Sequence, residues 1–501
     1  MVAVKMPRKS VLTAFLATLF WMLFITAAAG QAGEPPSSLQ SQVLARVEVP
    51  GLLQDLNLPV YADLTDAAGK YYALVIAPRT RLETAGVSFQ TLDAYSPGTR
   101  YLLALARRPG ARRNAAASVK ILHDDGRRIL VRYAPGLDEL LADLGFALRL
   151  LGEKPMTLAI PTLRPRVLEF LLTPDPGVSS MIAAVTQETV NSYISGLSGE
   201  TPVMVEGSAY TITNRHTRSG TPLEKASRYV FEQLQGAGLN TSLHPWTYAS
   251  YANRNVVGEL TGAKLPDEIV LLTAHLDDLP LNGLAPGADD NASGCAALLT
   301  AAGIMGRHRF QRTIRFVFFT GEEQGLLGSE RYAEAVAGEN IVAVLNLDMI
   351  GYDSANGPTQ RLHTRKPANP GYQADLEIAA TFQEVVNTYG LAGSLQPIIT
   401  AEGESESDHS SFWDRGFAAV FAIEDDWDDF NPDYHSSGDK LQNLNLPYCT
   451  AQVKATVGTV AHLAGPIATA VSPTPTPWQI LLLSRQRPAD TFHGPPNFLV
   501  N

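Results

Sequence analysis

The chain has 501 residues, of which 45% are hydrophobic and 18% are charged. This composition supports full-sized buried cores and excludes an intrinsically disordered protein, and the length suits about two or three domains. The formal net charge of -11 argues against a general nucleic-acid-binding protein and suits a soluble one. The two cysteines, Cys295 and Cys449, cannot form a disulfide framework, and the sequence does not show whether they pair.

Residues 1–33 have the pattern of a secretory signal peptide. Lys5, Arg8 and Lys9 precede the apolar run VLTAFLATLFWMLFITAAA, and small residues that suit cleavage follow. The run is also long enough to remain as an uncleaved membrane anchor. We therefore predict a secreted or extracytoplasmic protein that has no membrane contact beyond this segment.

Residues 34–175 are predicted to form a smaller α+β domain with an internal repeat. Lys70–Leu92 resembles Arg127–Leu151, because each contains a strand, an Ala-Pro pair, a short amphipathic helix, a glycine and an alternating strand. A further strand and a glycine turn precede each copy. The region has no cluster of His, Asp and Glu, so we expect a scaffold or a pro-segment. A peptide-binding or autoinhibitory role is the alternative.

Residues 181–466 alternate between apolar β-branched runs and helical patterns. The expected strands are 255–260, 268–274, 312–320, 341–349 and 417–423. The expected helices are 181–197, 222–238, 295–305, 329–337, 374–389 and 447–463. This alternation predicts an α/β/α sandwich with a mixed, mostly parallel central sheet. Residues 467–501 form a Pro/Thr linker and a tail of unknown purpose.

Acids and imidazoles occur at or just beyond the ends of these strands and in one later loop. They are His275 with Asp277, Asp289 with Asp290, Glu322 with Glu323, Asp348, and His435. Each residue alone fits a surface acid or a hydrogen-bonded histidine. A buried cluster of carboxylates, however, repels itself unless a cation neutralises it. Zinc accepts His, Asp and Glu as ligands, and one carboxylate can bridge two ions. The pattern therefore predicts a hydrolytic metal site.

Six motifs carry a more specific resemblance. The order HLDD, APGADDNASG, FFTGEEQGLLGS, LNLDMIGY, SDHSSFW and NPDYHSSGDKL is similar to that of the secreted zinc aminopeptidases of peptidase family M28. The resemblance covers about residues 181–465 and leaves the N-terminal and C-terminal parts outside. It implies a zinc-exopeptidase-like fold, two Zn²⁺ ions per chain, and peptide substrates with a free N-terminus.

The resemblance also implies a ligand set. The implied ligands are His275 and Asp348 for one zinc ion, Glu323 and His435 for the other, and Asp290 as the bridge between them. Asp289 is the alternative bridge. A cis peptide bond is expected directly after the bridging aspartate.

Further residues around the metals receive roles by position and resemblance. Glu322 diverges from its neighbour and is expected to be the general base, and Tyr434 is expected to hydrogen-bond the oxyanion unless it only packs beside the metals. Asp277 suits an acceptor that orients the His275 imidazole. His409 is not expected to be a ligand. Residues 424–429 (EDDWDD) are expected to form either a solvated loop or an acidic rim that attracts a protonated α-amine.

The predicted function is hydrolysis of the N-terminal residue of peptides by an exported two-zinc exopeptidase. The alternatives are a carboxypeptidase or dipeptidase, a glutaminyl cyclase on the same scaffold, and a non-catalytic binding protein. The presence of all five expected ligands disfavours the cyclase, which keeps one metal. Side-chain preference and oligomeric state do not follow from the sequence.

Overall fold

The computed structural model describes residues 41–158, 172–354 and 357–467. The residues from Ser41 onward form one compact unit. The predicted signal peptide and the C-terminal tail lie outside the described residues. In the described part of the chain, no helix is both long and apolar enough to cross a bilayer.

An 8-stranded mixed sheet forms the centre of the C-terminal part. In spatial order its strands are β11 (Asn240–Tyr248), β12 (Tyr251–Leu260), β14 (Arg312–Phe319), β13 (Leu265–His275), β15 (Asn340–Leu347), β18 (Ala419–Ile423), β16 (Thr359–His363) and β17 (Gln396–Thr400). The four central strands β14, β13, β15 and β18 run parallel to one another. Strand β12 pairs antiparallel with both β11 and β14, and β16 pairs antiparallel with β18 but parallel with β17. The predicted mixed, mostly parallel sheet is confirmed.

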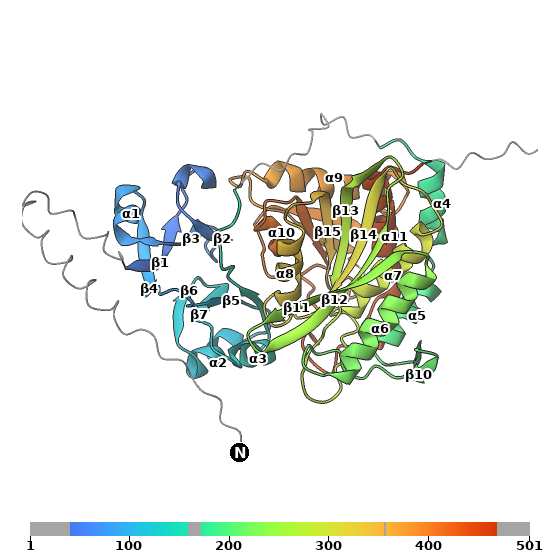
Figure 1. The fold of residues 1–501 in the computed structure, drawn as a ribbon, viewed down its shortest axis with the longest axis horizontal. Coiled ribbons are helices and arrows are strands. Elements are labelled where there is room, and N and C mark those ends of the chain that lie inside the picture. The colour runs from blue at the N-terminus through green and yellow to red at the C-terminus, as the bar shows by residue number, and fades with distance from the viewer. Residues whose placement is uncertain (1–40, 159–171, 355–356, 468–501) are drawn as a thin grey trace, which may run out of the picture. The chain divides into compact units, whose positions relative to one another are not determined.

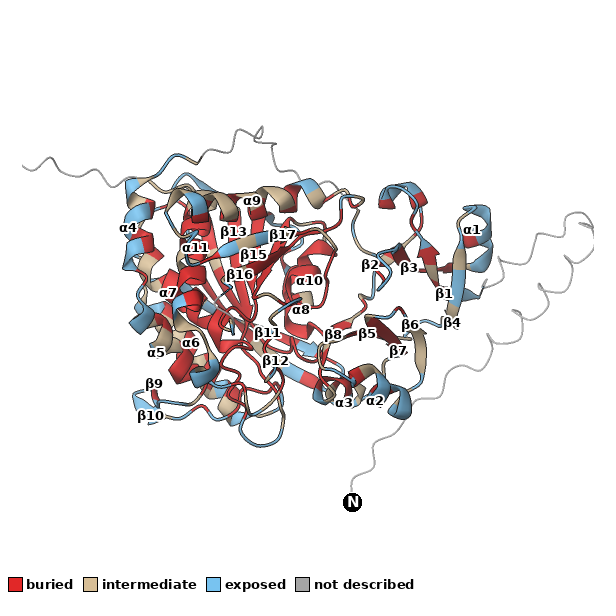
Figure 2. Ribbon diagram, turned by 180° about the vertical axis from the view of Figure 1, so that it is seen from behind, coloured by how far each residue is buried: buried red, intermediate tan, exposed pale blue. Residues whose placement is uncertain are grey.

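Helices cover both faces of this sheet (Figure 1). They are α4 (Pro176–Ala184), α5 (Gln187–Leu197), α6 (Thr221–Gly236), α7 (Ala292–Met305), α8 (Leu327–Ala335), α9 (Tyr372–Thr388), α10 (His409–Trp413) and α11 (Leu446–Ala464). Alternate residues of β13 point to opposite faces: Val270 packs in the large core with α7 and α11, and Leu271 packs in the smaller core with α8 and α10. Because both faces are buried (Figure 2), the strand sequences are almost continuously apolar.

Some elements differ from the prediction. The expected helix 181–197 is two helices, because Val185 is extended and the Thr186 hydroxyl accepts a hydrogen bond from the Thr189 amide to begin α5. Strand β11 was not predicted, since most of its side chains are exposed or half-buried and the apolar alternation is weak. Cys295 and Cys449 are both buried and unpaired.

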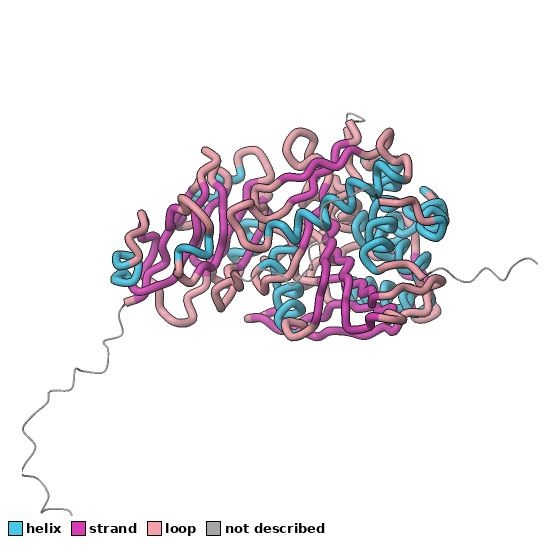
Figure 3. The backbone as a smooth tube through the Cα atoms, turned by 90° about the horizontal axis from the view of Figure 1, so that it is seen from above, coloured by secondary structure: helices cyan, strands magenta, loops and turns pink. Residues whose placement is uncertain are grey.

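Two 4-stranded antiparallel sheets form the N-terminal region, and their strands appear in magenta with those of the central sheet in Figure 3. The first contains β1 (Gln42–Glu48), β2 (Val60–Thr65), β3 (Tyr71–Pro78) and β4 (Phe89–Ala94), with η1 (Leu53–Leu56) and α1 (Arg79–Thr84). The second contains β5 (Tyr101–Ala106), β6 (Ile121–Asp124), β7 (Arg128–Arg132) and β8 (Phe146–Leu150), with α2 (Ala111–Ser118) and α3 (Leu137–Asp143). The strand orders β2-β3-β1-β4 and β6-β7-β5-β8 correspond, in keeping with the predicted repeat.

A buried arginine, Arg215, fastens the loop between β13 and α7. Its side chain is fully buried and donates to the carbonyls of Leu276 (2.8 Å) and Gly287 (2.9 Å). It also lies 3.2 Å from a carboxylate oxygen of Asp278. A Cβ at Gly287 would come within 2.7 Å of Nη2 of this arginine, so the glycine allows the close approach. One guanidinium group therefore binds both ends of the loop that leads to Asp290.

We expect Arg215→Met to lower the free energy of unfolding by about 3–5 kcal/mol, because the substitution leaves the Asp278 charge buried without its partner. Urea denaturation followed by circular dichroism measures the change. Arg79→Ala is the control: Arg79 forms an exposed pair with Glu83, and its loss should cost less than about 1 kcal/mol. Equal stabilities of the two variants would contradict the role of Arg215.

Candidate metal centre

The carboxyl ends of the parallel strands bring the predicted residues to one edge of the sheet. His275 is the last residue of β13, Asp348 directly follows β15, and Glu322 and Glu323 lie in the turn after β14. Parallel strands end on the same side of a sheet, where α/β proteins bind their ligands. All four side chains are buried.

Asp290 enters the same space from the start of α7. The side chain of Asn291 caps this helix by accepting a hydrogen bond from the Gly294 amide at 2.9 Å. A Cβ at Gly294 would lie 2.4 Å from the Asn291 side chain and 2.7 Å from the Leu347 carbonyl, so the glycine lets the helix start pack against the end of β15. The Asp290–Asn291 peptide bond is cis, as expected.

The acids and imidazoles form two groups that could each hold a metal ion, and both groups contain Asp290. His275 Nε2 lies 3.1 Å from Asp348 Oδ1 and 3.2 Å from Asp290 Oδ1. His435 Nε2 lies 2.8 Å from Glu323 Oε2 and 3.4 Å from Asp290 Oδ2. Each carboxylate oxygen of Asp290 therefore faces a different group, which is the arrangement of a bridging ligand.

Asp289 points away from both groups. Its carboxylate accepts hydrogen bonds from the Gly351 amide at 2.7 Å and from the Asn431 side chain at 3.0 Å. The amides of Asp289 and Asp290 donate to the Asp439 carboxylate at 3.0 and 2.9 Å. Asp439 thus holds the backbone that presents Asp290, a role that we did not predict although the residue lies in the NPDYHSSGDKL motif.

The donor set fits divalent cations. Glu323 Oε1 is buried and has no hydrogen-bond partner among the described residues. Burial, and after it the charge of Asp290, raises the pKa of Glu323 well above its ordinary value. A cation would reverse this repulsion, because opposite charge favours the ionised carboxylate. Two imidazoles and three carboxylates are nitrogen and oxygen ligands that zinc accepts.

Asp277 lies against the His275 imidazole, and its backbone carbonyl makes the closer contact. His275 Nδ1 lies 3.1 Å from the Asp277 backbone carbonyl, whereas the nearer Asp277 carboxylate oxygen is 3.8 Å away. The carboxylate instead accepts hydrogen bonds from the amides of Glu322 (3.3 Å) and Glu323 (3.4 Å). The residue therefore orients the imidazole through its backbone and the glutamate turn through its side chain.

Glu322 and Tyr434 line a cavity together with members of both groups. Burial raises the pKa of Glu322 well above its ordinary value, and the charge of Asp348 adds to the effect. The Tyr434 ring stacks on His435 with 3.6 Å between ring centroids. Burial and the carboxylate of Asp290 raise the pKa of Tyr434 well above its ordinary value. The phenol stays protonated and can donate a hydrogen bond into the cavity.

His409 belongs to neither of the two groups found in the described residues. Its Nε2 lies 2.8 Å from the Glu404 carbonyl, and burial lowers its pKa to about 3. The expectation of a solvated loop at 424–429 is wrong for Glu424 and Asp426, which are buried. Glu424 accepts hydrogen bonds from two backbone amides, and Asp426 lies 3.1 Å from His363 Nε2. These hydrogen-bond partners take the place of the water that would solvate the two carboxylates in an exposed loop.

Two further contacts support the groups from outside. The Ser407 hydroxyl donates to Asp348 Oδ2 at 2.7 Å, and this serine lies in the SDHSSFW motif. The carbonyl of Ala142, in α3 of the N-terminal region, lies 3.1 Å from His435 Nδ1. Such outer contacts fix the orientation of metal-binding imidazoles. A backbone carbonyl leaves no trace in the sequence, so the Ala142 contact could not be predicted.

Comparison with known proteins gives the family. A profile described as "Peptidase family M28" matches residues 255–460. A "Probable leucine aminopeptidase" of Arthroderma otae is 30% identical over 271 residues, which cover 50% of this chain and 68% of that protein. The chain belongs to peptidase family M28. The prediction from the motifs is confirmed, and this M28 protein is an enzyme, a metallo-aminopeptidase hydrolase.

Further similarities agree with the M28 family. A "Probable leucine aminopeptidase" of Trichophyton verrucosum is 28% identical over 299 residues, covering 56% of this chain and 76% of the relative. Among solved structures, the LapA aminopeptidase of Legionella pneumophila has a TM-score of 0.55 at 21% identity and covers 74% of this chain and 100% of its own. LapB of the same organism has a TM-score of 0.54 at 19% identity, covering 73% and 99%. These structures show the fold.

We expect Asp290→Asn to weaken metal binding at both groups, because asparagine removes the charge and one of the two oxygens that face them. Dialysis against zinc followed by elemental analysis should give about two ions per wild-type chain and fewer per variant chain. Asp289→Asn is the matched control, since the adjacent side chain is buried but faces away. Loss of metal only in Asp289→Asn would identify that residue as the bridge.

Zinc binding is expected to release protons near neutral pH. Burial alone lowers the pKa of His275, but the Asp348 and Glu322 charges raise it well above its ordinary value, and the pKa of Glu323 is also raised. These groups hold protons that zinc must displace, so affinity falls as pH falls, by about tenfold per pH unit for each proton released. Calorimetry in buffers of different ionisation enthalpy counts those protons. Zinc affinity that is constant between pH 6 and 8 would contradict the expectation.

Proposed function

We propose that this M28 enzyme is an exported dinuclear zinc aminopeptidase that removes the N-terminal residue of peptides. The observation that carries the proposal is Asp290, whose two carboxylate oxygens face two separate groups of metal-binding side chains. The proposed ligands are His275 and Asp348 for one ion and Glu323 and His435 for the other. Export rests on the signal-peptide pattern of residues 1–33.

Two zinc ions held there would polarise the scissile carbonyl and lower the pKa of a water bound to them. Glu322 lines the same cavity but belongs to neither group found among the described residues, so its carboxylate is available as a general base. It accepts a proton from the attacking water and passes that proton to the departing amine. A carboxylate suits both steps, because it accepts a proton from water and can return that proton to an amine.

Tyr434 is proposed to stabilise the negative charge that develops on the carbonyl oxygen. Its hydroxyl stays protonated because burial and nearby carboxylates raise its pKa. A donor already oriented toward the developing charge costs little reorganisation during the reaction. The stacking on His435 holds the ring in place and is compatible with this role.

The cavity also indicates the class of side chain that the enzyme accepts. Met349, Phe421, Ile423 and Phe430 line it beside the metal-binding residues. Apolar walls favour apolar N-terminal residues, because burying each methylene group of such a side chain contributes about 0.8 kcal/mol. The M28 relatives named above as probable leucine aminopeptidases are consistent with this preference.

One observation bears on the carboxypeptidase alternative. Arg107 lines the metal cavity, and a carboxypeptidase needs a basic group to bind the substrate carboxylate. This guanidinium, however, lies 3.0 Å from Asp426 and 3.2 Å from Glu404. Two carboxylates already neutralise it, so aminopeptidase activity is the better-supported function.

The test uses leucine p-nitroanilide, its N-acetylated form and an N-blocked dipeptide with a free C-terminus. The zinc-loaded enzyme should cleave only the substrate with a free amine. Glu322→Gln should lower kcat by about 10²- to 10⁴-fold with unchanged zinc content. Equal cleavage of the acetylated substrate would refute aminopeptidase activity. Glu330→Gln on α8 is the control and should keep the activity of the wild type. Full activity of Glu322→Gln would refute the assignment of Glu322 as the base.

A further inference from the structure

A large open cavity adjoins the metal centre. Its volume is about 1060 Å³, and pockets of about 300–1,000 Å³ bind drug-sized ligands. Arg107 and Phe430 line both this cavity and the smaller one over the metal-binding residues. A peptide whose first residue lies at the metals therefore has room beside it for the residues that follow the cleaved bond.

Arginines predominate in the lining of the open cavity. The five arginines are Arg107, Arg108, Arg112, Arg113 and Arg127, and the three acids are Asp124, Glu402 and Asp426. The lining side chains thus carry a formal net charge of +2, in a chain whose total is -11. A cleft lined mainly by one sign of charge concentrates ligands of the opposite sign.

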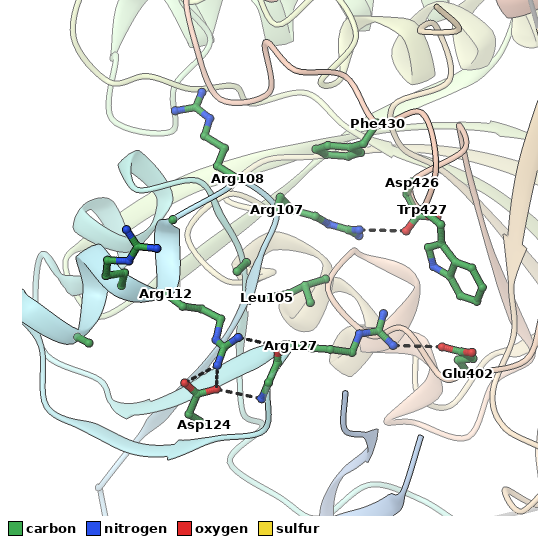
Figure 4. Close-up of a pocket in the computed structure, with 15 residues that line it drawn as sticks. Leu105, Arg107, Arg108, Arg112, Asp124, Arg127, Glu402, Asp426, Trp427 and Phe430 are labelled. Atoms are coloured by element: carbon green, nitrogen blue, oxygen red, sulfur yellow. Dashed lines mark hydrogen bonds and ion pairs between the residues drawn. The ribbon is translucent and has the colours of Figure 1, made fainter. Parts of the chain in front are cut away.

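Each carboxylate in the lining already has an arginine partner. The pairs are Arg112–Asp124 (2.6 Å), Arg127–Glu402 (3.1 Å) and Arg107–Asp426 (3.0 Å), and Figure 4 shows them in the cavity. In the adjoining loop, Asp425 and Asp428 pair with Arg361 at 2.9 and 3.2 Å. Arginines therefore offset much of the negative charge of residues 424–429, and the cavity does not favour a second cation.

Two of the arginines, by contrast, have no carboxylate partner. Arg113 is exposed and forms no hydrogen bond or ion pair with any residue that the structure describes. Arg108 is half-buried and donates a hydrogen bond to the Tyr434 carbonyl, which is uncharged. Both guanidinium groups therefore keep a positive charge that an anionic ligand can neutralise.

Aromatic side chains make the cavity suitable for a peptide. Trp427 lines it with 45% of its surface exposed, and the Arg361 guanidinium lies 4.5 Å from the centre of its ring. Phe430 lies where the two cavities adjoin. Aromatic residues and arginines are enriched where proteins bind other polypeptides. The lining thus fits a peptide that carries negative charge better than it fits a small inorganic anion.

We propose that this cavity binds the part of a peptide that follows the cleaved bond, and that Arg108 and Arg113 favour peptides with a carboxylate in that part. The inference deepens the proposed aminopeptidase function and rests on it. The carboxylate belongs either to an Asp or Glu side chain or to the C-terminus of a short peptide, because both present the same two acceptor oxygens to a guanidinium group.

The first test compares peptides that differ in one charge. Leu-Ala-Ala-Glu-amide is compared with its glutamine counterpart, and the variable residue is then moved to the second and third positions. Leucine release by the zinc-loaded enzyme should be favoured about threefold in kcat/KM by glutamate at one position or more, since an ion pair in contact with water is weak. Added salt should reduce the preference.

The C-terminal carboxylate is tested with Leu-Ala-Ala-Ala as the free acid and as the amide. A higher kcat/KM for the free acid identifies the terminus as a source of the recognised carboxylate. Equal values for these two peptides, together with no preference for glutamate at any position, would overturn the proposal.

Arg113→Glu assigns the preference to the cavity. Because Arg113 is exposed and unpaired among the described residues, the melting temperature should stay that of the wild type, whereas the glutamate-to-glutamine ratio should fall to about one or below. Arg307→Glu is the matched control: Arg307 is also exposed and follows the end of α7 that lies away from Asp290. An unchanged ratio in Arg113→Glu, or an equal fall in both variants, would overturn the assignment.

Binding of a blocked peptide separates this inference from the proposed function. N-acetylated tetraglutamate has no free amine for an aminopeptidase to recognise, and calorimetry should show weaker binding to Arg113→Glu than to the wild type or Arg307→Glu. If that difference holds but no leucine is released from any peptide or from leucine p-nitroanilide, the aminopeptidase function fails and the carboxylate site stands. Equal binding to the wild type and Arg113→Glu would overturn the site.

Discussion

The structure depends on neutralising an unusual concentration of buried carboxylates. Asp290, Glu323 and Asp348 converge at the end of the sheet, where a cation held by the candidate metal groups would relieve their mutual repulsion. A second set, Glu404, Glu406 and Asp426, lies next to the first and is neutralised by arginines of the N-terminal region. Guanidinium groups of the same chain thus neutralise the second set of carboxylates, and the first set offers two candidate sites for cations.

Several acids act on the backbone instead of on a metal ion. The Asp439 carboxylate accepts hydrogen bonds from the two amides that precede α7. The Asp277 carboxylate accepts hydrogen bonds from the amides of Glu322 and Glu323. Arg215 donates hydrogen bonds to the carbonyls of Leu276 and Gly287 at the two ends of the intervening loop. These contacts hold the backbone of the loops that present Asp290, Glu322 and Glu323, and such support makes a site rigid where the structure is irregular.

The parts predicted from sequence share a physical basis. Strands such as β13 and β14 are buried on both faces, so their apolar runs are clear. His275, Glu323 and Asp348 were predicted as ligands because they follow such strands, whereas Asp290 and His435 were predicted from their motifs. Edge strands such as β11 gave no comparable signal because water covers much of their surface. The metal-binding roles, like the domain boundaries, stay predictions.

Long-range contacts account for what the sequence could not predict. Arg107 resembles any surface arginine until folding sets it between Glu404 and Asp426, roughly three hundred positions later in the chain. The Ala142 contact is made by a backbone atom, and the buried Asp426 has Arg107 as a partner from the other region. Side-chain patterns within one segment carry no information about partners supplied by another region.

The order of the parts along the chain has a consequence for biosynthesis. Residues 41–158 leave the ribosome before His435, the last of the proposed metal ligands, and N-terminal domains generally fold first during synthesis. The two antiparallel sheets can then form before the segments that carry the proposed metal ligands are complete. The arginines of that region are therefore in place before Glu404, Glu406 and Asp426, their partners in the catalytic domain, leave the ribosome.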